Sequence, residues 1–187
     1  ARAAIRFIKS DRIDMAELVE ILEDIAADDK RAGDIIRNLR AMVKPEEGEE
    51  EMISINDVLL ETLSLFHSES VIRDVRIRRE LAPDLPPVRG NKVQLQQVLI
   101  NLLMNAAESM TYEQGDRVII LRTRVPKDDR IRVSLRDFGT GIDEQELGRI
   151  FEPFFTTKHA GLGMGLSLAR SIIEAQGGRI WAQNNAD

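Results

Sequence analysis

The sequence predicts an α+β fold, a two-layer sandwich in which a mixed β-sheet is covered on one face by helices, preceded by a helical hairpin. Three observations lead to this prediction. Two segments of alternating apolar and polar residues, 118–125 and 130–136, flank a short turn and predict a β-hairpin. Apolar residues recur at helical spacing after Asn91 and again after the glycine-rich run 161–165. A further helical pattern, over residues 15–43, alternates spacings of three and four.

The N-terminal pattern predicts a coiled-coil-like seam. Asp14 and Glu17 form a capping pair at its start, and Pro45 ends the helix. Residues 1–9 would be the end of a preceding antiparallel helix. A seam of this length must be buried against a partner, and a single packed surface helix is the alternative. Only Asp29 interrupts the apolar stripe, which consists of Met15, Leu18, Leu22, Ile25, Asp29, Ala32, Ile36, Leu39 and Val43.

The acidic residues 45–51, with Gly48 among them, predict a linker before a second domain that spans 52–187. The last predicted helix stops at Gly177-Gly178, a common C-terminal signal, and a strand-like stretch follows. From the linker onward, the expected elements are a strand at 53–55, a helix over 56–72, a strand over 75–81, a turn at Pro83, Pro86 and Pro87, a helix after Asn91, the hairpin, the last helix, and the stretch 179–182.

The glycine-rich run at 161–165 indicates a phosphate site. Gly161, Gly163 and Gly165 alternate with larger residues and lead directly into an apolar helical pattern. Glycines permit a close approach of the backbone to oxyanions, and a helix start supplies free N–H groups. The alternative is a flexible lid that binds no ligand.

Asp137 directly follows a predicted strand and precedes Gly139 and Gly141. A carboxylate at a strand end can accept a hydrogen bond from the exocyclic amine of adenine, whereas guanine presents an acceptor at that position. The residue therefore indicates selection of ATP over GTP. An aspartate that merely stabilises a tight turn is the alternative.

Asn101 and Asn105 lie four residues apart on the predicted helix after Asn91, so both amides share one face. A side-chain carbonyl oxygen suits Mg²⁺, which keeps several waters and completes its shell with phosphate oxygens. Asparagines on an apolar helix can also serve only to satisfy backbone groups or water.

Four runs in this half of the chain together resemble the N, G1, F and G2 boxes of the Bergerat-fold ATPases, specifically the catalytic domain of sensor histidine kinases. The resemblance covers 52–187 and implies a Bergerat-type mixed sheet that binds ATP and Mg²⁺. In this order the runs are Asn101-Leu-Leu-Met-Asn105, Asp137-Phe-Gly-Thr-Gly141, Phe151-Glu-Pro-Phe-Phe155 and Gly161-Leu-Gly-Met-Gly-Leu166.

The resemblance also assigns roles to single residues. Asn105 would hold Mg²⁺, Asn101 would support the phosphate side, and Asp137 would contact the adenine amine. Gly139 and Gly141 would bring the backbone to the base. The glycines Gly161, Gly163 and Gly165 would form the hinge of an ATP lid, and Ile142, Phe151 and Leu166 are candidate apolar contacts, each equally explicable as core.

One position separates kinases from hydrolases in this group. The gyrase, chaperone and mismatch-repair relatives have a glutamate one turn before the metal-binding asparagine, where it can act as a general base. Asn101 occupies that position here, and an amide cannot accept the proton. The chain is therefore better suited to phosphoryl transfer, for which Lys158 could neutralise charge, although a solvated surface lysine is the alternative.

The resemblance further implies that residues 1–44 belong to a dimerisation and histidine-phosphotransfer hairpin. Two such hairpins would form a dimeric four-helix bundle, and a response-regulator aspartate would receive the phosphoryl group. The acceptor histidine is absent, because no histidine precedes His67. His67 is expected on a helix surface and His159 in the mobile lid. The chain would therefore begin after the acceptor site, and its sheet would lack the last edge strand.

Composition narrows the classes of function. The net charge of −6 argues against nonspecific binding to nucleic acid. The sequence shows no signal peptide and no apolar run of about 20 residues, so no membrane contact is expected from these residues. The absence of cysteine fits a cytoplasmic protein. Two functions compete with the kinase: an ATP-hydrolysing clamp of the same fold, and a nonenzymatic dimerisation module with a degenerate pocket.

Overall fold

The structure is a computed structural model that describes residues 15–16, 18–25, 50–111, 115–126, 130–158 and 162–185. The chain divides into two compact units, residues 1–45 and 46–187. In the first unit, residues 15–16 and 18–25 are helical; of the expected seam, Met15 and Leu22 are exposed and Leu18 and Ile25 are half-buried. The remainder of the expected seam and hairpin, and the linker before residue 50, lie outside the described residues.

Five strands of the second unit form two sheets. β1 (Glu51–Ile53) pairs antiparallel with β3 (Val88–Gly90) in a short ribbon. The larger sheet has the order β2-β4-β5 and consists of β2 (Arg76–Glu80), β4 (Val118–Arg124) and β5 (Arg132–Arg136). β2 runs parallel to β4, and β5 runs antiparallel to it, so the sheet is mixed as expected.

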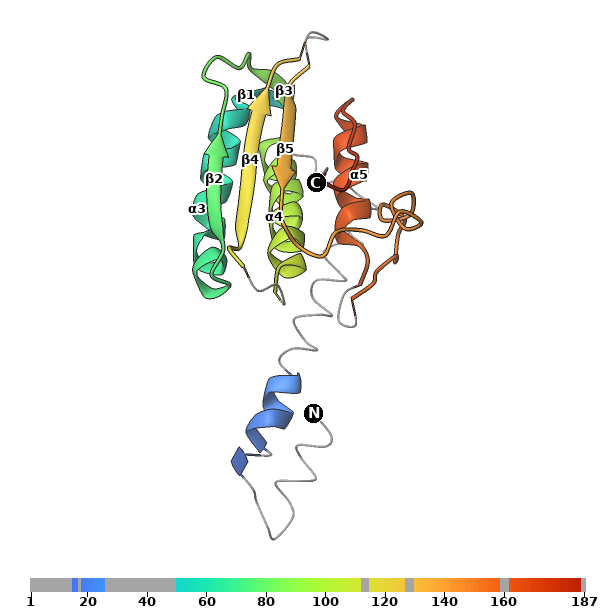
Figure 1. The fold of residues 1–187 in the computed structure, drawn as a ribbon. Coiled ribbons are helices and arrows are strands. Elements are labelled where there is room, and N and C mark those ends of the chain that lie inside the picture. The colour runs from blue at the N-terminus through green and yellow to red at the C-terminus, as the bar shows by residue number, and fades with distance from the viewer. Residues whose placement is uncertain are drawn as a thin grey trace. The chain divides into compact units, whose positions relative to one another are not determined.

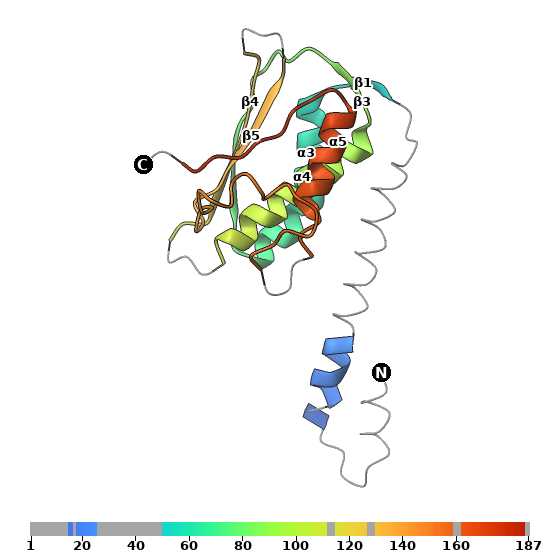
Figure 2. The ribbon, with the colours of Figure 1, turned by 90° about the vertical axis from the view of Figure 1, so that its right-hand side faces the viewer.

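Three helices cover one face of this sheet. They are α3 (Ile55–Ile72), α4 (Lys92–Ser109) and α5 (Gly165–Ala175). Figure 1 shows the sheet in front of the helices, and the perpendicular view in Figure 2 shows that all three lie on the same side. α4 packs against both α3 and α5 and is therefore the central helix of the layer.

The core lies between the sheet and the helices. β4 alternates strictly: Ile119, Leu121 and Thr123 are at most 2% exposed, while the residues between them face away from the helices. Phe66 of α3 and Leu103 of α4 are 1% exposed and lie in the same layer. The alternation in β4 is therefore a direct consequence of burying one face only.

A buried threonine connects the sheet to the start of α3. The hydroxyl of Thr123 accepts a hydrogen bond from the N–H of Ala82 at 2.9 Å and donates to Asn56 Oδ1 at 3.2 Å. The Asn56 side-chain nitrogen donates to the carbonyl of Ala82 at 2.8 Å. This closed set of bonds satisfies the buried polar atoms and fixes the entry into the proline-rich loop.

The structure differs from the sequence-based expectation at three places. The first strand lies at 51–53 rather than 53–55, because Ser54 caps α3 and accepts from the N–H of Asp57. β3 was not expected: three residues after two prolines carry little periodic signal, and the strand depends on pairing with β1. The stretch 179–182 is not a strand.

The C-terminal stretch is held by side chains instead of a strand ladder. Arg132 of β5 lies over the ring of Trp181 at 5.3 Å from the centroid. Asn185 donates to the carbonyl of Asp137 at 2.8 Å, and Asn184 contacts both backbone polar groups of Ile142. The extended residues therefore run beside β5 without backbone pairing to it.

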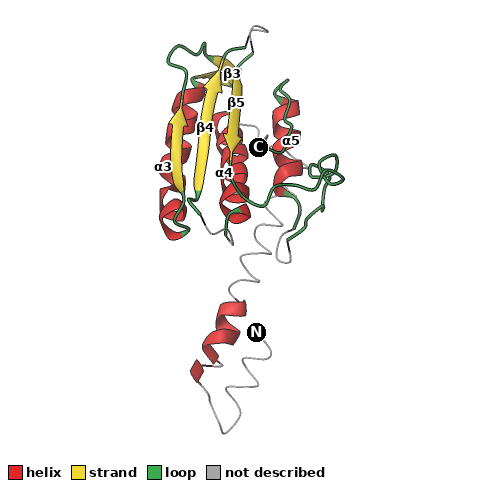
Figure 3. Cartoon of the chain, viewed as in Figure 1, coloured by secondary structure: helices red, strands yellow, loops and turns green. Residues whose placement is uncertain are grey.

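The segment between β5 and α5, residues 137–164, contains no helix or strand in its described part. Figure 3 shows it as a long loop beside the C-terminal half of α4 and the start of α5. This loop carries most of the residues expected to bind the nucleotide, so its anchoring to α4 decides the geometry of the site.

Candidate nucleotide site

One stripe of α4 organises the candidate site. Asn101, Asn105 and Ser109 recur every four residues and therefore lie on one face of the helix. Each of them makes a hydrogen bond to a different segment of the chain, namely the start of α5, Lys158 and Asp137. Asn91 positions the helix itself, because its side chain caps the helix by accepting from the N–H of Gln94 at 3.1 Å.

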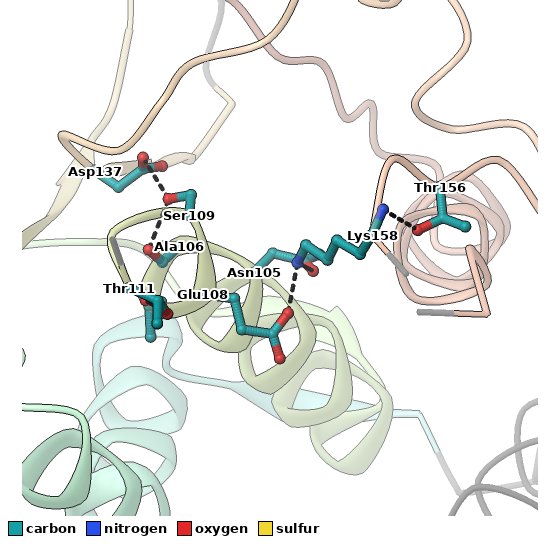
Figure 4. A network of polar contacts seen from close by, with 9 residues as sticks. Asn105, Ala106, Glu108, Ser109, Thr111, Asp137, Thr156 and Lys158 are labelled. Atoms are coloured by element: carbon teal, nitrogen blue, oxygen red, sulfur yellow. Dashed lines mark hydrogen bonds and ion pairs between the residues drawn. The ribbon is translucent and has the colours of Figure 1, made fainter. Parts of the chain in front are cut away.

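Asp137 lies immediately after β5, as expected. Its Oδ1 atom lies 3.0 Å from the hydroxyl of Ser109, whose hydrogen is shared with the carbonyl oxygen of Ala106 at 2.8 Å (Figure 4). The same Oδ1 atom accepts a hydrogen bond from the N–H of Gly139 at 3.0 Å. Because both bonds use the same oxygen, Oδ2 is the atom available to a ligand. The carboxylate is thereby held in a defined orientation at the edge of the helical layer.

Lys158 connects the loop to α4. Its ammonium group donates to Asn105 Oδ1 at 3.1 Å and to Glu108 Oε2 at 2.5 Å (Figure 4). The N–H of Lys158 also donates to the hydroxyl of Thr156 at 3.1 Å, which tightens the turn before it. The structure therefore brings Lys158 and Asn105 together, two residues that the sequence had suggested separately.

The oxygen atoms around the Lys158 ammonium group indicate whether a metal ion could bind at this position. It is a cation held by an amide oxygen of Asn105 and a carboxylate oxygen of Glu108. Both are hard oxygen donors of the type that Mg²⁺ takes from proteins, where it keeps waters and phosphate oxygens for the rest of its shell. The donor set therefore fits a magnesium ion.

Asn101 contacts the start of α5. Its side-chain nitrogen donates to the carbonyl of Gly165 at 3.3 Å. The N-cap residue of α5 is Met164, which makes no side-chain capping bond, so within the described part of the chain the first N–H groups of this 11-residue helix are not capped by their N-cap residue. A helix start in this state is suited to bind an anion.

Three of the candidate glycines lie in the described part of the loop where a side chain would not fit. Gly163 has a φ of +66°, and a Cβ atom there would overlap the backbone of Phe155. Gly141 has a φ of +72°. Gly139 lies directly against Ser109, where a Cβ atom would overlap the hydroxyl. Gly139 thus allows the loop to approach α4 closely, and Gly163 allows it to pack against its own segment at Phe155.

The remaining candidates are placed as follows. Ile142, Phe151 and Leu166 are half-buried and come from three separate segments of the chain. Gly161 and His159 lie outside the described residues. His67 is exposed on α3, as expected for a helix-surface residue.

Two polar residues of the site were missed from the sequence. Ser109 holds Asp137, and Glu108 holds Lys158. The signal for Ser109 was present, since it continues the four-residue spacing of Asn101 and Asn105 by one more turn. Glu108 had no such signal, because its role depends on where the loop places Lys158.

Fold and site together define a nucleotide-binding α+β domain of the Bergerat type. The chain matches the family described as "Histidine kinase-, DNA gyrase B-, and HSP90-like ATPase" over residues 90–187, which is more than half of its length. The chain belongs to this ATPase family.

Individual relatives point to one branch of the family. The chain is 41% identical over 169 residues to the sensor protein FixL of Bradyrhizobium diazoefficiens, an alignment that covers 90% of this chain and 33% of FixL. It is 33% identical to the signal transduction histidine-protein kinase AtoS of Escherichia coli K12, with 91% of this chain and 27% of AtoS covered. The chain thus spans about a third or less of these relatives.

Solved structures agree with the same branch. The catalytic domain of histidine kinase ThkA superposes with a TM-score of 0.64 at 34% identity, covering 74% of this chain and 89% of that one. A crystal structure of ThkA in complex with the response regulator protein TrrA gives a TM-score of 0.78 at 27% identity, covering 97% of this chain and 51% of that one.

None of the described helices is long and apolar enough to span a bilayer.

Proposed function

We propose that this chain is the ATP-binding, phosphoryl-donating part of a sensor histidine kinase. The hydrogen bonds of the α4 stripe carry this proposal. Through them, one face of the helix contacts the carboxylate of Asp137, the ammonium group of Lys158 and the start of α5. These groups supply the three functions that a bound nucleoside triphosphate requires: selection of the base, neutralisation of the phosphates and anion binding by backbone amides.

Each residue has one role in this proposal. Asp137 accepts from the adenine amine through Oδ2, while Ser109 and Gly139 hold Oδ1. Lys158 moves from Asn105 to a phosphate oxygen when the nucleotide binds. Mg²⁺, when bound, would be held by Asn105 and supply positive charge to the phosphates. Gly161, Gly163 and Gly165 form the lid hinge, and Ile142, Phe151 and Leu166 provide apolar contacts to the base.

The reaction is transfer of the γ-phosphoryl group to a histidine. The bond between the γ-phosphorus and the bridging oxygen breaks, a histidine nitrogen forms the new P–N bond, and ADP leaves with the electron pair. No histidine lies among residues 1–44, the expected phosphotransfer helices, and His67 lies on α3 of the second unit. We therefore place the acceptor histidine outside these 187 residues, with a response-regulator aspartate as the next acceptor.

The assembly and location belong to the same proposal. Residues 1–44 would form half of a dimeric four-helix bundle through the seam, 45–51 would be the linker, and 52–187 the catalytic domain. The exposed Met15 and Leu22 support such a seam, because apolar side chains in a regular helical row need a partner. A cytoplasmic location is part of the proposal, and the proposed use of ATP and the lack of cysteine fit it.

Asn101 favours transfer over hydrolysis. Its amide nitrogen donates to the carbonyl of Gly165, a bond that a carboxylate at this position could not make. A hydrolysing clamp would need a general base here. Measurable ATP turnover by the chain alone would favour the clamp, and the absence of binding heat with Mg²⁺ and high micromolar ATP would favour a nonenzymatic module.

A calorimetric titration tests the proposed contact between Asp137 and the adenine amine. Asp137→Ala should weaken ATP binding by about 1.5–3 kcal/mol, the usual cost of losing a charged hydrogen bond, and should reduce the preference for ATP over GTP. Asp84→Ala, at an exposed position of the proline-rich loop, is the control and should bind as the parent does. Unchanged ATP affinity in Asp137→Ala would contradict the role.

The metal ligand is tested by titrating ATP with and without Mg²⁺. Asn105→Ala should make binding insensitive to Mg²⁺, because the amide oxygen is lost. Gln97→Ala, two turns earlier on α4, should keep the dependence of the parent. A magnesium dependence that persists in Asn105→Ala would remove this residue from the metal site.

Transfer itself is tested with a separate helical hairpin that carries an acceptor histidine. With γ-labelled ATP, the hairpin should acquire label that is lost in acid and retained in base, as expected for a phosphoramidate. No label on the hairpin, in a chain shown to bind ATP, would contradict the kinase proposal.

A further inference from the structure

The face of sheet β2-β4-β5 that points away from the helices concentrates positive charge. Ile119, Leu121 and Thr123 of β4 point toward the helices, so the alternate residues of β4 and their partners in register form the opposite face, which we call the outer face. Figures 1 and 2 show no helix on this side of the sheet in the described part of the chain. The strand residues with charge there are Arg76, Arg78, Glu80, Arg122, Arg124, Arg132 and Arg136.

Six arginines and one glutamate give the outer face a charge of +5, although the whole chain carries −6. Glu80 forms ion pairs with Arg78 and Arg122, and Arg76 pairs with Asp116. Among the described residues, no carboxylate pairs with Arg124, Arg132 or Arg136. The uncompensated charge therefore lies mainly along β5 and the adjoining end of β4.

The arrangement of these arginines costs stability within the sheet. Arg124 and Arg132 are direct partners across the antiparallel β4–β5 pair, and like charges in such a pair repel each other. Arg132 lies over Trp181, and Arg136 lies over Phe138 at 4.9 Å from the ring centroid. Stacking holds the two guanidinium groups in place, so they are oriented before any partner arrives.

A hollow of about 470 Å³ lies at the end of the outer face where β4 begins. Ile120 and Phe138 supply apolar surface to it, Arg78 and Arg117 supply positive charge, and the one carboxylate of the lining, Asp116, is paired with Arg76. Phe138 is 46% exposed and Trp181 is 48% exposed, so both aromatic rings remain accessible on this side. The hollow is suited to one apolar side chain in a surrounding of arginines.

We propose that the outer face binds an acidic segment of a partner protein, rich in Asp and Glu, with one apolar side chain that enters the hollow. Arginine forks pair with carboxylates in two-bond geometry, and this face contains arginine with no lysine. An extended polyanion such as a membrane or a nucleic acid would also come within about 10 Å of the acidic remainder of the domain, a distance at which 0.1 M salt does not screen the repulsion. A short acidic segment matches the size of the positive surface and avoids that repulsion.

A fluorescein-labelled peptide of glutamates with one central leucine is the probe, measured by fluorescence anisotropy with the complete chain. The parent should bind it in low salt and lose binding as salt increases. Arg124→Gln combined with Arg132→Gln should weaken binding at least tenfold. The control combines Arg89→Gln and Arg170→Gln, two exposed arginines away from the outer face, and should bind as the parent does.

Thermal unfolding separates lost binding from lost structure. The Arg124→Gln, Arg132→Gln variant should unfold in the same cooperative transition as the parent, because removal of a like-charge pair offsets the loss of the Arg132–Trp181 stacking. The single variant Arg136→Gln provides a second measurement and should also weaken binding. Failure of the parent to bind the peptide, equal binding by both double variants, or tighter binding to phosphatidylserine-containing vesicles or to an oligothymidylate than to the peptide would overturn the proposal.

Discussion

At the scale of single residues, one hydroxyl decides how the base-reading carboxylate is presented. Ser109 donates to Asp137 Oδ1 from the last turn of α4, and the N–H of Gly139 donates to the same atom. Without these bonds a carboxylate at the end of a strand could rotate freely. The side chain of Ser109 is therefore a positioning group for the proposed adenine contact.

Ser109→Ala tests this role. The variant should keep its fold but bind ATP about tenfold more weakly, because a hydrogen bond to a charged group contributes roughly 1.5 kcal/mol or more. Calorimetry with ATP and GTP is the measurement, since a purely structural role would reduce both affinities equally. Ser64→Ala, exposed on α3, is the control. An unchanged ratio of ATP to GTP affinity would contradict the positioning role.

Gly163 is the second residue whose identity matters. Gly163→Ala should lower the free energy of unfolding by at least about 1 kcal/mol, because a positive φ costs that much for a residue with a Cβ atom. The overlap with the backbone of Phe155 adds to this cost and should displace the loop before α5. Gly148→Ala, where a Cβ atom meets nothing within 4 Å, is the matched control in chemical denaturation. Equal stability of the two variants would refute the steric account.

At the scale of elements, one carboxylate links two strands of the sheet. Glu80 of β2 is hydrogen-bonded to Arg122 of β4, and this bond, together with the charges of Arg122 and Arg78, lowers the pKa of the Glu80 carboxyl below 4.5. A lowered pKa in the folded state means that the ionised form stabilises the fold at neutral pH. This contribution is lost as the pH falls below 4.5 and through the lower, folded-state value.

Glu80→Gln should therefore flatten the acid limb of the stability curve. Below pH 4.5 the parent should lose stability more steeply than the variant, whereas at pH 7 the variant should be the less stable of the two. Urea denaturation at a series of pH values is the measurement, with Glu174→Gln on α5 as the comparison. If the free energy of unfolding falls equally steeply with acid in the parent and in Glu80→Gln, the Glu80–Arg122 pair does not contribute to the pH dependence of stability.

The helices and strands also show which elements local sequence patterns are sufficient to predict. α3 and the end of α5 lie within about one or two residues of their expected limits, and α4 begins after Asn91 as expected, because the apolar spacing and the signals at Asn91 and Gly177 act locally. β3 and the stretch 179–182 could not be assigned correctly from sequence. The first exists only through pairing with β1, and the second, despite its strand-like composition, meets β5 through side chains.

At the scale of the whole molecule, the second unit has a core of its own. The buried clusters contain residues from Ile53 to Leu121, all within residues 46–187. Ile53, Val58 and Leu99 join the short ribbon to the helices, while Phe66 and Leu103 lie under the larger sheet. None of the described core residues comes from the N-terminal unit.

A chain of residues 46–187 should therefore fold and bind ATP without the N-terminal unit. Its unfolding should be a single cooperative transition, and its ATP affinity should match that of the complete 187-residue chain within about threefold. Thermal unfolding and calorimetry of both chains are the measurements. A shorter chain that is folded but fails to bind ATP would show that the N-terminal unit contributes to the nucleotide site.

The sequence by itself determined the class of fold, the order of the four motifs and the residue types of the site, because helix periodicity, strand alternation and glycine-rich turns are local properties. Only the tertiary structure decided which groups meet. It joined Lys158 to Asn105 and Glu108, joined Ser109 to Asp137, and collected arginines from three strands on one face. These contacts depend on how a loop of irregular structure folds onto α4 and on strand register, and neither is encoded in the spacing of nearby residues.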